Sequence, residues 1–149
     1  MTSGVKFGFI NGIIDMLALL VGLYATKVSK VGMIGAIVAM MISNPINDSY
    51  SLYISAEEEG KSEARQKATH ALVMQILTHA SFLLIIILST NTTTAIKISI
   101  FYSLMIILAF DKYFNIKVLE TIKKIGIILI LISVTYFADA KVYQYFPDK

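Results

Sequence analysis

Hydrophobic positions dominate this chain in five long runs, and short polar stretches separate them. The runs cover residues 7–25, 30–56, 69–89, 96–110 and 125–138. A helix that crosses the hydrocarbon core of a bilayer needs about 20 predominantly apolar residues, and these runs reach or approach that length. The pattern predicts an all-α integral membrane protein in which residues 1–149 form a single domain of five transmembrane helices.

The composition leaves little room for anything besides a membrane domain. Hydrophobic residues make up 56% of the chain and charged residues 15%, and the mean hydropathy is +0.72. Soluble domains are about 45–50% apolar and about 25% charged. There is no cysteine, which excludes disulfides and thiolate metal sites. The net charge of +3 is not gathered into a basic patch interleaved with aromatic residues, so we expect no nucleic-acid partner.

The lysines and the one arginine lie mostly between the apolar runs, and their distribution predicts the orientation. Eight of them precede the first run or fall in the second and fourth connections, whereas five lie on the opposite side. Cytoplasmic loops carry the excess of lysine and arginine. This balance predicts a cytoplasmic N-terminus and a C-terminus on the outer or lumenal side.

Two carboxylates interrupt the first and second runs. Asp15 lies in the first run, where Asn11 precedes it by one helical turn, and Asp48 lies in the second run, one turn after Asn44. Met41 continues the second stripe by a further turn. Charged residues inside membrane helices are costly and mark ion pathways by default. Carboxylate and amide oxygens suit Mn²⁺ and Fe²⁺, and a thioether softens the site.

Other residues extend this predicted path. Pro45 lacks a backbone N–H, so it predicts a helix break that frees the carbonyl of Met41. The connection 57–67 is short, with both acidic and basic residues, and its glutamates predict a cytoplasmic metal entry: Glu57, Glu58, Glu59 and Glu63. A solvated helix end is the alternative interpretation of these glutamates. Weaker candidates for the path are Ser51, Ser55, His70 and Met74.

The two polar stripes resemble motifs of the vacuolar iron transporter family. Residues 11–22, NGIIDMLALLVG, are similar to the first-helix motif of that family, and residues 43–55, SNPINDSYSLYIS, are similar to its second-helix segment. In this alignment Asn11 stands at the family's aspartate, Asn44 at its methionine and Asp48 at its glutamate. The chain resembles a short, divergent member that lacks most of the family's cytoplasmic metal-binding domain.

The resemblance implies a function and an assembly. It implies proton-coupled export of Fe²⁺ or Mn²⁺ from the cytoplasm by a homodimer, with the path between spans 1 and 2. It implies no cofactor, because the metal is cargo, and the partners are then the lipid bilayer, divalent cations and a second copy of the chain. The membrane is either the plasma membrane of a prokaryote or a vacuolar or other internal membrane.

Two further functions remain open at this point. The chain is alternatively a scaffold or assembly protein that uses its helices only for packing, or a passive cation channel. We expect no enzyme, because the Tyr-Asp and Gly-x-Gly-Asp contexts of an intramembrane aspartyl protease are absent from the sequence.

Overall fold

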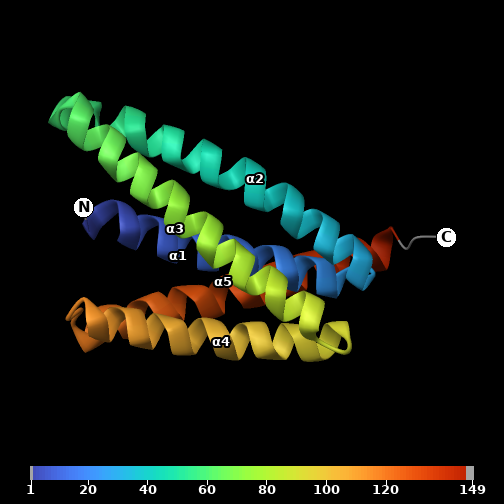
Figure 1. Cartoon of the computed structure of the whole chain (residues 1–149). Helices are drawn as coiled ribbons and strands as arrows, with labels where there is room; N and C mark the ends of the chain where they lie inside the picture. Colours follow the sequence, from blue (N-terminus) through green and yellow to red (C-terminus); the bar gives the residue numbers. More distant parts are fainter. Residues whose placement is uncertain (1, 147–149) are drawn as a thin grey trace. The chain divides into compact units, whose positions relative to one another are not determined.

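The computed structural model describes residues 2–146, and the described chain is helical almost throughout (Figure 1). The elements within this range are α1 (Thr2–Ala25), α2 (Lys30–Ser55), the short 3₁₀-helix η1 (Glu57–Glu59), α3 (Lys61–Leu88), α4 (Thr92–Tyr113) and α5 (Val118–Tyr145). All five α-helices are long and apolar enough to cross a membrane. The all-α class and the five candidate spans predicted from the sequence are therefore confirmed.

The helices are longer than the apolar runs, and two predicted connections need correction. Only residues 114–117 of the predicted connection 111–124 lie outside the helices, and residues 61–67 of the connection 57–67 form the first turns of α3. The physical reason is that a helix satisfies its own backbone hydrogen bonds in any solvent. It therefore does not have to end where an apolar run ends, and polar turns can continue it.

Tight turns join the helices. Lys27 and Asn115 adopt left-handed backbone conformations with φ of 57° and 51°, and Gly60 has φ of 116°. The Oδ1 atom of Asn91 accepts a hydrogen bond of 2.8 Å from the backbone N–H of Thr94 and caps the start of α4. The predicted helix break at Pro45 is wrong, because Pro45 lies inside the uninterrupted α2. Membrane helices tolerate an internal proline where neighbouring groups satisfy the freed carbonyl.

The described chain divides into two compact units. The first unit contains residues 2–16 and 34–84, which are the beginning of α1, most of α2 and most of α3. In it α2 and α3 form a helical hairpin closed by η1 (Figure 1). Buried side chains include Phe9, Ile13, Ile37 and Phe82.

The second unit contains residues 17–33 and 85–146. Its α4 and α5 lie side by side as an antiparallel pair (Figure 1). The Nζ atom of Lys30 donates to the backbone carbonyls of Ile87 and Ser89 at 2.9 and 2.6 Å, and so satisfies orphan carbonyls at the end of α3. Asp111 and Ile107 of α4 and Ile128 of α5 are buried.

Candidate functional site

A stripe of glycines brings α1 against the backbone of α3. Gly4, Gly8 and Gly12 recur every four residues and lie on one face of α1. A Cβ atom at Gly4 or Gly8 would collide with the backbone carbonyl of Lys67 or Ala71, respectively. A Cβ atom at Gly12 would lie 3.0 Å from the Cβ atom of Thr78. Only helices with small residues at the contact approach so closely.

This approach places Gln75 of α3 between the two carboxylates. The Nε2 atom of Gln75 donates to Oδ2 of Asp15 at 3.0 Å and to Oδ2 of Asp48 at 2.7 Å. The Gln75 side chain is fully buried. Because one nitrogen contacts both carboxylates, Asp15 of α1 and Asp48 of α2 lie close enough to share a ligand.

Two asparagines complete the cluster by pairing across the helices. The Nδ2 atom of Asn11 on α1 donates to Oδ2 of Asp48 on α2 at 2.6 Å. The Nδ2 atom of Asn44 on α2 donates to Oδ2 of Asp15 on α1 at 3.3 Å. We call these five residues, Asn11, Asp15, Asn44, Asp48 and Gln75, the amide–carboxylate cluster. All of them belong to the first unit.

The electrostatics of the cluster favour a cation. Two carboxylates side by side in an apolar setting repel each other and are deprived of water, and both effects oppose two negative charges. Amide N–H groups are dipoles without net charge, so they offset only part of this cost. A positive ion between Asp15 and Asp48 would offset part of both costs.

The side-chain amides of the cluster can either donate to the carboxylates or offer oxygen atoms to a cation. The oxygen and nitrogen of an Asn or Gln side chain exchange places when the amide turns by 180° about its last torsion. Turned in this way, Asn11, Asn44 and Gln75 would present carbonyl oxygens to a cation. The Oε1 atom of Gln75 is buried and has no hydrogen-bond partner among residues 2–146.

A second buried polar side chain lies one turn further along α3. His79 is fully buried, and neither of its ring nitrogens has a hydrogen-bond partner within the described chain. It lies near enough to Asp48 to interact with that carboxylate electrostatically. His70, nearer the start of α3, also has a buried nitrogen, Nδ1, without a hydrogen-bond partner in the described chain.

The structure brings only part of the predicted path together. Asn11, Asp15, Asn44 and Asp48 meet directly, but no hydrogen bond within the described residues joins the cluster to the weaker candidates Ser51, Ser55, His70 and Met74, or to Met41. Ser51 and Ser55 are exposed, and Ser55 donates to the carbonyl of Leu52.

The predicted metal entry is an exposed surface in the described part of the chain. Glu57 and Glu58 are exposed, and the side chain of Glu59 lies outside the described residues. Glu63 forms an ion pair of 3.3 Å with Lys67 one turn later. Among the described residues, no group of three or more His, Asp or Glu side chains is placed to hold a metal ion. The cluster offers two carboxylates and three amides instead.

Sequence reasoning missed Gln75, the residue that joins the two carboxylates. It is uncharged, and a single amide in an apolar run attracts less notice than a carboxylate. Its register against the glycines of α1 becomes visible only in the structure. Lys67, Ala71 and Gln75 recur every four residues on α3, in step with the glycines of α1.

Comparison with protein-family models, curated proteins and solved structures finds no match for this chain. The resemblance to the vacuolar iron transporter family stays a prediction from the two sequence motifs around Asp15 and Asp48.

Proposed function

We propose that this protein is a homodimeric membrane transporter that exports a divalent metal cation, Fe²⁺ or Mn²⁺, from the cytoplasm. The observation that supports this most directly is the pair of carboxylates, Asp15 and Asp48, held by one amide nitrogen within helices of membrane-spanning length. Two negative charges match one divalent ion, so the occupied site is close to neutral and tolerable inside a bilayer.

The donor set supports a first-row metal with a preference for oxygen. Carboxylates and amide carbonyls suit Mn²⁺ and, less strongly, Fe²⁺. Binding requires Asn11, Asn44 and Gln75 to turn their oxygens inward, which releases the hydrogen bonds that stabilise the empty site. This exchange keeps binding reversible, as transport requires.

Coupling to protons follows from the same two carboxylates. When the metal leaves, a proton on Asp15 and another on Asp48 restore a neutral site. The site therefore alternates between a form that holds the metal and a form in which its carboxylates hold protons. One divalent ion then exchanges for up to two protons, and the exchange carries no net charge when both carboxylates are protonated.

A second copy of the chain fits the exposed face of α2. Small and polar residues recur there every four positions and are exposed: Gly35, Ala39, Ser43, Asn47, Ser51 and Ser55. A Cβ atom at Gly35 would meet no atom within 4 Å, so packing within the chain does not require this glycine. Small residues in such a stripe allow membrane helices to approach each other closely.

The exposed faces of the other helices differ from this stripe. On α3, α4 and α5 they are formed mainly by large apolar side chains, among them Leu84, Phe101, Met105, Ile130 and Phe137. Such faces suit lipid, whereas the amide of Asn47 needs a polar partner in a bilayer. We propose that the α2 stripe packs against the α2 stripe of a second copy.

Metal flux into proteoliposomes tests the transport function. We expect the wild type to move Mn²⁺ and Fe²⁺, and Asp15→Asn and Asp48→Asn each to reduce the flux by at least tenfold because the site loses half its charge. Glu120→Gln is the control, since Glu120 is exposed at the start of α5 and lies outside the cluster. Undiminished flux in both aspartate variants would refute the proposal.

A pH indicator inside the same vesicles separates coupled transport from a channel. Proton exchange predicts a change of internal pH that follows metal entry and disappears in Asp15→Asn. Metal movement without any change of internal pH would identify a passive channel. The absence of metal movement in the wild type would favour a scaffold.

A further inference from the structure

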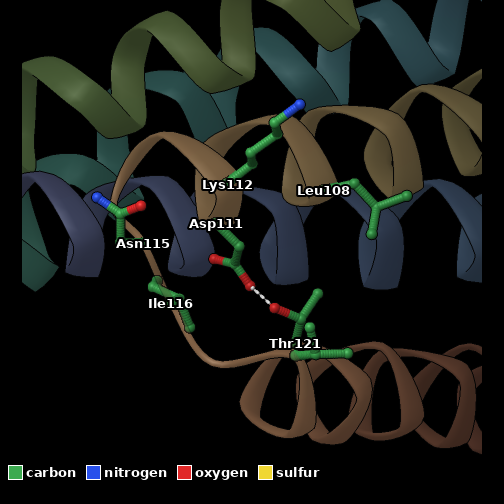
Figure 2. A pocket seen from close by; sticks show the side chains of 7 residues that line it. Leu108, Asp111, Lys112, Asn115, Ile116 and Thr121 are labelled. Atoms are coloured by element: carbon green, nitrogen blue, oxygen red, sulfur yellow. Dashed lines mark hydrogen bonds between the residues drawn. The ribbon is translucent and has the colours of Figure 1, made fainter.

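The turn between α4 and α5 encloses a cavity that takes no part in the amide–carboxylate cluster. Its volume is about 520 Å³, and the residues that line it are Leu108, Asp111, Lys112, Asn115, Ile116, Val118 and Thr121 (Figure 2). All of these residues belong to the second unit. The left-handed conformation of Asn115 shortens the turn and brings the end of α4 against the start of α5.

The one carboxylate in the cavity is already engaged. Asp111 is almost fully buried and points toward Thr121, which donates a hydrogen bond of 2.7 Å to its Oδ2 atom (Figure 2). The ammonium of Lys124 pairs with the other carboxylate oxygen at 2.8 Å. The charge of Asp111 is therefore compensated from within the turn, and it repels an entering anion only weakly.

The remaining charges around the turn are mainly positive. Lys112, Lys117 and Lys123 are exposed, and none of them pairs with a carboxylate among residues 2–146. Lys112 points away from Thr121 and Asp111, so its ammonium does not lie beside the Asp111 carboxylate (Figure 2). Over residues 111–124 there are four lysines and two carboxylates, which leaves the turn with a net charge of +2.

The apolar part of the cavity continues onto the outside of the helices. Leu108 and Val118 line the cavity and are 47% and 74% exposed, and Leu119 and Ile122 extend the exposed apolar surface along α5. The turn joins two helices of membrane-spanning length, so it lies at the level of the lipid headgroups. The ligand that fits has an anionic head and an apolar tail.

We propose that this cavity binds an anionic phospholipid, with its phosphate near Lys112 and Asn115 and an acyl chain along Leu108 and Val118. Basic pockets between membrane helices are typical sites for anionic headgroups. A free phosphate ion would use the lysines but not the apolar wall. A zwitterionic lipid would use the wall but gain little from the positive charge.

Native mass spectrometry of the purified protein in detergent tests this site. Phosphatidylglycerol and phosphatidylcholine with identical acyl chains are titrated separately. We expect phosphatidylglycerol to bind more tightly, and Lys112→Gln to weaken it about fivefold, the factor that corresponds to ~1 kcal/mol per lysine near an anionic lipid. Binding of phosphatidylcholine should not change.

Lys97→Gln is the matched control, because Lys97 is an exposed lysine near the opposite end of the same helix. Equal losses in Lys97→Gln and Lys112→Gln would overturn the site in favour of general charge attraction. Equal binding of the two lipids to the wild type would overturn the headgroup assignment, and displacement of phosphatidylglycerol by millimolar inorganic phosphate would overturn the role of the acyl chain. None of these results depends on metal transport.

Discussion

A glutamine amide can donate two hydrogen bonds and accept two, and Gln75 uses its nitrogen for both carboxylates of the cluster. Its buried Oε1 atom has no partner within the described chain. His79, one turn later on α3, is equally buried and has two such nitrogens. The two residues share a helix and a degree of burial, but only Gln75 is bonded to charged groups.

This difference predicts opposite effects of the same substitution. Gln75→Leu should destabilise the protein by about 1–3 kcal/mol, because two partly buried carboxylates lose a donor. His79→Leu should leave the thermal unfolding temperature unchanged or raise it, because it removes a buried polar ring without a partner. Thermal unfolding of both variants in one detergent is the measurement. Similar losses in the two variants would show that Gln75 has no special role.

At the scale of the helices, the contact between α1 and α3 has a fixed register. The glycines of α1 and the residues opposite them on α3 advance together in steps of four, so the two helices run parallel in fixed register. The register decides which α3 residue reaches Asp15. A shift of one turn would replace Gln75 by Ala71 or His79.

Adding one methyl group to this contact should be costly. We expect Gly8→Ala to destabilise the protein by about 1–3 kcal/mol, since the new Cβ atom would collide with the backbone carbonyl of Ala71. Gly126→Ala in α5 is the control, because a Cβ atom there would meet nothing within 4 Å. It should stabilise the helix by as much as ~1 kcal/mol, the propensity difference between glycine and alanine. Urea or thermal unfolding in detergent compares the two, and equal stability would rule out the close contact.

At the scale of the whole molecule, the helices differ in the side chains that they expose, and this difference bears on where a second copy would pack. Large apolar side chains on α3, α4 and α5 suit contact with lipid. On α2, exposed apolar side chains such as Ile42, Ile46 and Ile54 flank a stripe of exposed glycine, alanine, serines and Asn47. An exposed amide in hydrocarbon costs free energy unless another protein group bonds to it. This contrast is the reason for proposing α2 as the contact with a second copy of the chain.

Ala39→Leu should reduce dimer formation at least tenfold, because the larger side chain keeps two α2 helices apart. Ala109→Leu, on the exposed face of α4, is the matched control and should leave the dimer intact. Light scattering of the purified variants measures the oligomeric state. Dissociation of both variants, or of neither, would argue against the α2 interface.

The class of the protein and part of the site were already evident in the sequence. Apolar runs determine helices and a membrane setting, because hydrocarbon demands internal backbone hydrogen bonds and apolar side chains. The same reasoning selected Asp15 and Asp48, since carboxylates within such runs are rare. It identified Asn11 and Asn44 as well, because each lies one turn from a carboxylate.

Helix ends and contacts between helices required the tertiary structure. Hydropathy shows where the apolar runs end, but α3 begins at Lys61 and α4 continues to Tyr113, because polar residues remain helical beyond those runs. The role of Gln75 depends on the distance and register between α1 and α3, which a single sequence leaves undetermined. The sequence alone therefore determined the membrane class and the two carboxylates, and only the packing of three helices decided that one amide joins them.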